Sequence, residues 1–195
     1  MGISSSVIYN YKYGINMKAI FLDRDGVINR AIVKNGRPYP PESLDKLEIL
    51  PGVKEALTNL HKNGYYLIIV TNQPDIARGK TSEKIVNEIH EYLMNNFPLK
   101  EIISCFHDDN DDCECRKPKP GGLFRAAKKY KLNLASCYMI GDRWRDIEAG
   151  ISAGCKTIFL DYGYSEKQPE TINFRVRSLF EASKIILGET NNELK

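Results

Sequence analysis

The sequence lacks any long hydrophobic run, because its longest wholly apolar or aromatic stretch, Tyr65 to Val70, has only six residues. A transmembrane helix needs about 20 such residues, so we expect no segment that crosses a membrane. The start of the chain also lacks a basic region followed by a long apolar one, so it does not resemble a secretory signal. We expect residues 1–16 to form an N-terminal extension that could be disordered, and residues 17–195 to form one domain.

The sequence also has little net charge, with 28 Lys and Arg against 25 Asp and Glu, which leaves +3. This excess is too small for a dedicated nucleic-acid or membrane-surface binder, although a local basic site for a small anion remains open. Five cysteines are an odd number in a chain without an export signal, which argues against a disulfide framework. We therefore expect a cytoplasmic protein that acts as a monomer on a small molecule.

Apolar segments alternate along the chain with segments of helical spacing. An alternation of strand and helix indicates parallel strands joined by right-handed crossovers, hence a single doubly wound, Rossmann-like α/β sheet. In such sheets, ligands bind at the carboxyl ends of the strands. The expected strands are 18–23, 65–71, 101–106, 136–140 and 156–160, and the expected helices are 51–64, 81–97, 122–130, 145–153 and 178–187.

The first expected strand ends in the sequence Asp23-Arg24-Asp25-Gly26-Val27. Side chains two residues apart in an extended segment point to the same side, so the carboxylates of Asp23 and Asp25 can converge while Arg24 points away. Such a pair could bind a divalent cation, with Asp23 as a nucleophile toward phosphorus and Asp25 as the proton donor. The alternative is an ordinary acidic turn, and this motif alone does not decide between them.

Polar residues also follow the later strands. Thr71 and Asn72 close the second strand and could bind phosphoryl oxygens, or could form a simple turn. Lys117 lies in a proline-rich loop that could present its ammonium group at a fixed point, unless that group is merely solvated. Asp142 could complete the oxygen shell of a hard cation. For Asp146, a role in the site and an ordinary place as an acid in the first turn of a helix are equally good explanations.

These motifs, Asp-x-Asp-Gly-Val, Val-Thr-Asn, Lys and Gly-Asp-x-x-x-Asp in that order, resemble the four motifs of the haloacid dehalogenase superfamily. The resemblance covers about residues 17–165, and the second aspartate points to the phosphotransfer branch. It implies a magnesium ion held by the Asp23 carboxylate, the main-chain carbonyl of Asp25 and the Asp142 carboxylate. It also implies that 17–195 is a phosphatase domain.

A consistent reaction can be written on these residues. Asp23 would attack the phosphate to form an aspartyl-phosphate, with Lys117 neutralising charge and Thr71 holding phosphoryl oxygens. Asp25 would protonate the departing alkoxide and then deprotonate the hydrolytic water. This role requires the pKa of Asp25 to lie above its ordinary value of about 3.9.

Four metal-binding side chains cluster within eleven residues. Three thiolates and one imidazole are the donor set of a closed tetrahedral zinc site, so we expect a zinc-binding loop that positions the basic residues following it. The alternative, incidental buried cysteines, suits Cys137 and Cys155 better. The acidic residues inside the loop lack the spacing of a calcium-binding loop and are interpreted as solvated. The expected zinc ligands are Cys105, His107, Cys113 and Cys115, and the acidic residues are Asp108, Asp109, Asp111 and Asp112.

The zinc pattern, together with the sequences of residues 23–29, 71–73, 77–79 and 115–121, resembles the zinc-containing D-glycero-D-manno-heptose 1,7-bisphosphate phosphatases, with histidinol-phosphate phosphatases as near relatives. One departure is Pro74-Asp75-Ile76 after Gln73, where a small residue and glycine are usual. The resemblance implies removal of the 7-phosphate from the heptose bisphosphate, or alternatively hydrolysis of histidinol phosphate. It implies substrate contacts from Thr71, Asn72, Gln73, Arg116, Lys117 and Arg143.

The intervals between the motifs leave no room for a separate cap domain. We therefore expect only loops over the site: the proline-rich segment 35–41, the loop around Arg78 and the zinc loop. A nucleic-acid 3′-phosphatase and a catalytically inactive phosphate-binding protein are the alternatives from other classes; the low charge disfavours the first and the complete set of reactive groups the second. Five arginines exceed what one phosphate needs and favour a bisphosphate, unless they pair with surface acids: Arg24, Arg78, Arg116, Arg143 and Arg145.

Overall fold

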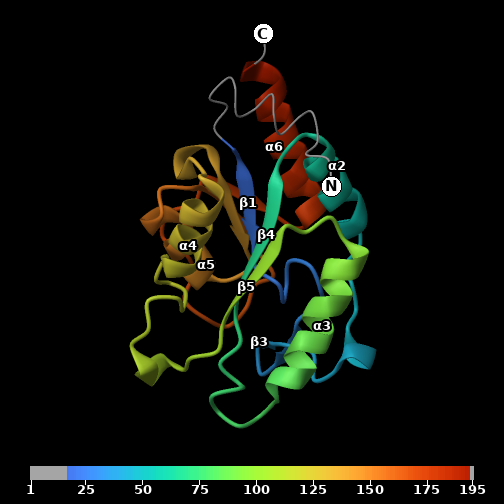
Figure 1. Ribbon diagram of the computed structural model, residues 1–195, viewed down its shortest axis with the longest axis vertical. Coiled ribbons are helices and arrows are strands. Elements are labelled where there is room, and N and C mark those ends of the chain that lie inside the picture. Colours follow the sequence, from blue (N-terminus) through green and yellow to red (C-terminus); the bar gives the residue numbers. More distant parts are fainter. Residues whose placement is uncertain (1–16, 194–195) are drawn as a thin grey trace.

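A computed structural model describes residues 17–193, so the expected N-terminal extension lies outside the described residues (Figure 1). Its centre is a six-stranded sheet in the order β5-β4-β1-β6-β7-β8, and every neighbouring pair of strands is parallel. The chain thus builds the sheet outward from β1, first to one side and then to the other. The strands are β1 (Ala19–Leu22), β4 (Tyr66–Asn72), β5 (Glu101–Cys105), β6 (Tyr138–Gly141), β7 (Lys156–Leu160) and β8 (Phe174–Val176).

Helices cover both faces of this sheet. The alternation of side chains along β1 shows the two layers, because Ile20 and Leu22 pack into one apolar cluster and Ala19 and Phe21 into another. The first cluster includes residues of α2 (Val53–Lys62), α3 (Glu83–Asn96) and α6 (Leu179–Glu193). The second includes residues of α4 (Gly121–Tyr130) and α5 (Trp144–Ser152). The predicted doubly wound α/β class is therefore confirmed.

The five predicted strands and five predicted helices are all present, with ends that differ by a few residues except at α6. Three strands were not predicted: β8 and the antiparallel pair β2 (Ile32–Lys34) and β3 (Arg37–Tyr39). Each of these strands has three residues, which is too short to display a hydrophobic period. β2 and β3 pair with each other, whereas β8 adds Phe174 and Val176 to the first apolar cluster at the edge of the sheet.

Loops gather where the parallel strands end. In Figure 1 the loops that follow β4 and β5 and the β2–β3 hairpin all lie toward the lower end of the view. Within residues 17–193, the insertion between β1 and α2 is this hairpin and a short 3-10 turn, not a separate cap domain. No helix in the described part of the chain is long and apolar enough to cross a membrane.

Candidate active site and metal centre

A buried lysine joins two carboxylates at the end of β1. The Lys117 ammonium lies 2.7 Å from Asp23 Oδ1 and 2.6 Å from Asp146 Oδ1, and it donates to the Val70 carbonyl at 2.7 Å. Lys117 is only 2% exposed, so its charge is balanced by these partners rather than by water. Burial alone would lower the pKa of Lys117, but Asp146 and Asp23 outweigh it and raise the pKa. The lysine is therefore a fixed positive charge beside Asp23.

Three carboxylates converge at the same place. Asp23, Asp142 and Asp146 offer oxygen atoms that all lie within 4.8 Å of one another. Asp142 Oδ2 accepts a hydrogen bond from the Tyr164 hydroxyl at 2.9 Å, whereas Oδ1 is buried without a hydrogen-bond partner. A hard divalent cation would satisfy that oxygen, so the donor set fits magnesium.

Gly26 makes this convergence possible. A Cβ atom at position 26 would lie 1.8 Å from Asp142 Oδ2, and the glycine adopts φ +91°. Any other residue would push Asp142 away and would also strain the backbone. The glycine of the first motif is therefore required both by the turn after β1 and by the close approach of Asp142.

The carboxylates raise one another's pKa. Burial raises the pKa of Asp23 to about 6, with Asp146 and Asp25 adding to the effect and Lys117 opposing it. Burial, Asp23 and Asp146 raise the pKa of Asp142 well above its ordinary value. Such a cluster keeps its carboxylates ionised more readily when a cation lies among them.

Asp25 differs from the sequence-based expectation. Its carboxylate accepts hydrogen bonds from the Arg24 guanidinium, from Asn29 Nδ2 at 2.9 Å and from Gln73 Nε2 at 2.8 Å. Burial would raise the pKa of Asp25, but Arg24, Asn29 and Gln73 outweigh it and lower the pKa. The expectation of a raised pKa is therefore wrong for this conformation, because the sequence could not show these three donors.

Arg24 also departs from the prediction. We expected its side chain to point away from the site and counted it among the cations around a substrate, yet it is fully buried and holds Asp25. Its Nη1 atom lies 3.0 Å from Nε2 of His90 on α3. Arg24 therefore acts as an internal support of Asp25 and is not available to a substrate.

A cleft of about 260 Å³ opens over the carboxylates. Its walls come from the three predicted loops, namely the β2–β3 hairpin, the loop after β4 and the loop after β5, and also from the segment that joins β6 to α5. Cations are frequent in this wall, which suits an anionic ligand. The lining residues include Asp23, Asp25, Arg37, Tyr39, Asn72, Arg78, Asp109, Arg116, Lys117, Arg143, Arg145 and Asp146.

The predicted substrate-contacting residues occupy different positions. Asn72, Arg116 and Arg143 line the cleft, whereas Thr71 and Gln73 are buried, at 2% and 1% exposure. Gln73 donates to the Thr71 hydroxyl at 3.0 Å as well as to Asp25. These two residues therefore connect the end of β4 to Asp25.

Asn72 and Arg143 have protein partners of their own. The Asn72 side chain donates to the Lys117 carbonyl at 3.0 Å and accepts from the Lys117 amide at 3.1 Å, so it clamps the main chain that carries the lysine. The Arg143 guanidinium pairs with Glu166, with Nε 2.9 Å from Oε1. Asn72 thus fixes the lysine, and Glu166 fixes the direction of Arg143.

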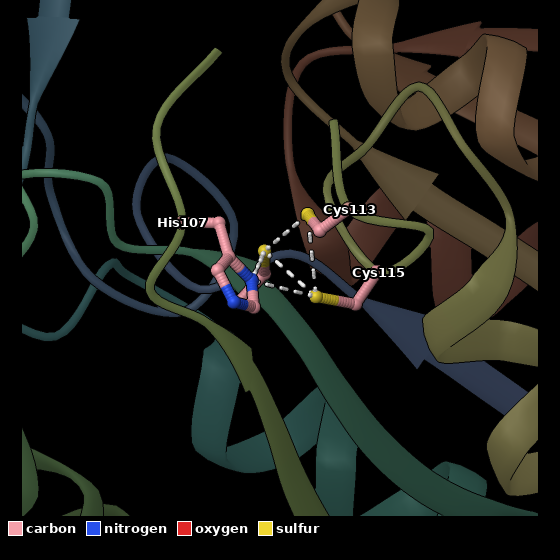
Figure 2. Close-up of side chains that lie close together, drawn as sticks. His107, Cys113 and Cys115 are labelled. Carbon is pink, nitrogen blue, oxygen red and sulfur yellow. Dashed lines mark hydrogen bonds between the residues drawn. The ribbon is translucent and has the colours of Figure 1, made fainter. Parts of the chain in front are cut away.

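The predicted zinc ligands come together at the end of β5 (Figure 2). The Cys105 sulfur lies 3.6 Å from that of Cys113 and 2.9 Å from that of Cys115, and His107 Nδ1 lies 3.5 Å from Cys105 and 3.3 Å from Cys115. Ligands at about 2.0–2.3 Å from a tetrahedral zinc ion are separated by about 3.3–3.8 Å. Apart from the short Cys105–Cys115 contact, the cluster has these dimensions, so the residues fit zinc.

The acidic part of this loop is not simply solvated, which corrects the sequence interpretation. Asp108 pairs with the Arg78 guanidinium, and Asp109 accepts from Arg116 Nε at 2.9 Å. The loop therefore reaches back over the cleft. Hydrophobic periodicity does not indicate such contacts, because the partners lie in different segments of the chain.

Three further residues of the site were missed or left undecided. Asp146 lies in the first turn of α5, as predicted for a helix acid, and its carboxylate also contacts the Lys117 ammonium. Tyr164 and Glu166 follow β7 in an irregular segment, and no motif in the sequence marks them. The position of Tyr164 after a strand was the one available indication.

Comparison with known proteins agrees with this geometry. A sequence model of the haloacid dehalogenase-like hydrolases matches residues 39–154. A D-glycero-alpha-D-manno-heptose-1,7-bisphosphate 7-phosphatase from Photorhabdus laumondii is 34% identical over 87% of this chain and 97% of its own. The beta-anomer 7-phosphatase from Escherichia coli K12 is 35% identical over 73% of this chain and 78% of its own.

Solved structures point the same way. The D,D-heptose 1,7-bisphosphate phosphatase from B. bronchiseptica, complexed with magnesium and phosphate, superposes with a TM-score of 0.76 at 30% identity and covers 89% of this chain and 99% of that chain. The chain belongs to the haloacid dehalogenase-like hydrolase family. Within that family it is a phosphatase, and its relatives over most of its length are heptose-1,7-bisphosphate 7-phosphatases.

Proposed function

We propose that the protein is a magnesium-dependent sugar phosphatase that removes the 7-phosphate of D-glycero-D-manno-heptose 1,7-bisphosphate through an aspartyl-phosphate. The observation that supports this most directly is the buried Lys117 ammonium between Asp23 and Asp146, beside Asp142 Oδ1, which has no hydrogen-bond partner. That arrangement provides a nucleophile, a fixed cation and an oxygen site for a metal within one cleft.

The nucleophile in this proposal is Asp23. Lys117 holds one Asp23 oxygen at 2.7 Å, which leaves the other oxygen to approach phosphorus. The same ammonium is placed to balance the charge of the phosphoryl group as the bond to the leaving oxygen breaks. Asn72 keeps Lys117 in place from the main-chain side.

Asp25 supplies and removes protons in this scheme. Its pKa is lowered in the present conformation, so it must become protonated once substrate is present. A phosphoryl group with two negative charges close to Asp25 raises the pKa of that carboxyl, because it disfavours a second anion nearby. The acid then protonates the sugar oxygen that leaves and afterwards accepts a proton from water.

Two metal sites complete the proposal. Asp23, the main-chain carbonyl of Asp25 and Asp142 would hold magnesium, which supplies positive charge opposite the transferred phosphoryl group. Four protein ligands would hold zinc in a closed site that orders the loop leading to Arg116. The zinc ligands in this proposal are Cys105, His107, Cys113 and Cys115.

The substrate is a small sugar phosphate, recognised by Arg116 and Arg143 at the cleft and by Asn72 at its floor. Thr71 and Gln73 support Asp25 from within the protein. We further propose that the protein works as a cytoplasmic monomer without nucleic acid or membrane.

Phosphate release from a panel of substrates tests this function. The panel contains both anomers of the heptose bisphosphate, histidinol phosphate and an oligonucleotide with a 3′-phosphate, each with magnesium. We expect kcat/KM to be highest for one heptose bisphosphate anomer, with the 1-phosphate retained. Preference for histidinol phosphate would identify the alternative amino-acid phosphatase, and preference for the oligonucleotide would overturn the assignment to sugar phosphates.

A further inference from the structure

Three arginines from three segments meet at one carboxylate in the cleft. Asp109 Oδ1 accepts hydrogen bonds from Arg116 Nε at 2.9 Å and from Arg145 Nη1 at 3.3 Å, and Asp109 Oδ2 accepts from Arg78 Nη2 at 3.3 Å. Arg78 follows β4, Arg116 follows the zinc ligands and Arg145 lies in the first turn of α5. All four residues line the same cleft as Asp23.

The arginines surround Asp109 as they would surround a phosphate. One oxygen atom shared by two guanidinium groups is a common arrangement at phosphate-binding sites, because guanidinium donors match carboxylate and phosphate oxygens alike. The Arg116 side chain is only 11% exposed, so it relies on an anion within the cleft. Arg78 has carboxylates of its own in Asp75 and Asp108. Asp109 is thus chiefly the anionic partner of Arg116 and Arg145.

This cluster lines the same cleft as the proposed nucleophile Asp23. Arg116 precedes Lys117, whose ammonium contacts Asp23. Arg145 precedes Asp146, which contacts the same ammonium. A molecule with one phosphate at Asp23 and a second anionic group a few bonds away would bring that second group to the arginines.

The Asp109 carboxylate is free to move away from the arginines. Its side chain is 50% exposed, and it lies in a three-residue 3-10 turn between the cluster ligands His107 and Cys113. The two residues flank the turn, and their side chains lie in the Cys/His cluster (Figure 2). The Asp109 carboxylate can therefore rotate toward solvent while the main chain at Arg116 and Lys117 stays in place.

We propose that Asp109 is a built-in competitor for the second anionic group of the substrate. Its carboxylate occupies the position between Arg116 and Arg145, and a substrate with two phosphates must displace it in order to bind both. A monophosphate binds at Asp23 and leaves Asp109 in place. Asp109 therefore affects specificity, because it lowers the affinity for bisphosphates relative to monophosphates. This inference rests on the proposed function in taking a bisphosphate as the substrate.

The opposite role is a positioning one, in which Asp109 holds the arginines ready for substrate. The two roles predict opposite signs for Asp109→Asn, which keeps the shape of the side chain and removes its charge. If Asp109 competes, the variant binds a bisphosphate more tightly relative to a monophosphate. If Asp109 positions the arginines, the variant loses affinity for the bisphosphate relative to the monophosphate.

The experiment measures inhibition of 4-nitrophenyl phosphate hydrolysis by heptose 1,7-bisphosphate and by heptose 7-phosphate, which differ only in the second phosphate. We expect the ratio of the two inhibition constants to shift by about fivefold in favour of the bisphosphate in Asp109→Asn, as for loss of one partly exposed ion pair. Asp109→Ala, which removes the carboxylate entirely, should shift the ratio in the same direction.

Asp112→Asn is the matched control, because Asp112 lies in the same loop but pairs with Lys119. It should leave the ratio unchanged, and metal analysis should find equal zinc in all variants. An unchanged or reduced preference for the bisphosphate in both Asp109 variants would overturn the proposal. Inhibition is measurable whether or not the heptose compounds are hydrolysed, so absence of their turnover would count against the proposed function alone.

Discussion

Replacement of Lys117 by methionine tests the centre of the site most severely. Methionine has a similar length and fills the space, but it removes the charge that lies 2.7 Å from Asp23 and 2.6 Å from Asp146. The lysine is 2% exposed, so water cannot replace it. Breaking a buried ion pair in this way costs about 3–5 kcal/mol of folding free energy. Loss of one preorganised charge also lowers kcat by about 100- to 1,000-fold.

Urea unfolding at pH 7 without added magnesium measures the first effect, and steady-state hydrolysis with magnesium measures the second. Lys119→Met is the matched control: Lys119 is partly exposed, pairs with Asp112 and Glu114, and should change the free energy of unfolding by less than about 0.5 kcal/mol. The double variant Lys117→Met with Asp146→Asn should recover about 1 kcal/mol or more, since it removes a carboxylate that has lost its partner. It should not recover activity. A Lys117→Met protein as stable as the parent would refute the buried-charge argument.

Three further predictions concern the other groups of the site. Asp23→Asn should abolish turnover while the protein stays folded, because an amide does not attack phosphorus; activity within about tenfold of the parent would exclude Asp23 as nucleophile. Asp25→Asn should slow the phosphorylation step less for aryl phosphates than for sugar phosphates, since good leaving groups need no acid, and equal losses in rapid-mixing experiments would contradict that role. Cys113→Ser should lower the zinc content, the melting temperature and kcat/KM together, and full activity in a zinc-free protein would show that zinc is dispensable.

The sequence predicted the sheet because its signals are local and repeated. The strand formed by residues 66–72 is a continuous apolar run closed by polar residues, and α3 shows apolar side chains at helical spacing before Pro98. The candidate site followed from the same logic, since Asp23, Lys117 and Asp142 come after strands whose carboxyl ends must meet in a parallel sheet. Position along the chain thus indicated that Asp23 and Asp142 meet, whereas Lys117, in the loop between β5 and α4, was assigned by the family resemblance.

Contacts between loops could not be predicted in this way. Nothing near Asp25 in the sequence indicates that Gln73 will donate to it, and the effect of this contact together with Arg24 is to reverse the direction of its pKa shift. Asp109 likewise resembled a solvated residue until its arginine partners, far apart in the sequence, were placed around it. The sign of an electrostatic effect depends on neighbours at about 3–4 Å, and a sequence pattern does not specify distances on that scale.

Because loops cover the cleft, the residues that would recognise a substrate are close in sequence to those proposed to carry out the reaction. Two of the arginines in the cleft are next in sequence to the buried ion pair: Arg116 precedes Lys117, which carries the ammonium group, and Arg145 precedes Asp146, which contacts it. A shift of the loop that carries Arg116 would therefore also move Lys117, which we propose to be catalytic. If the four ligands at the end of β5 hold zinc as proposed, they would anchor this loop rigidly, and changes at these ligands should alter affinity and turnover in parallel.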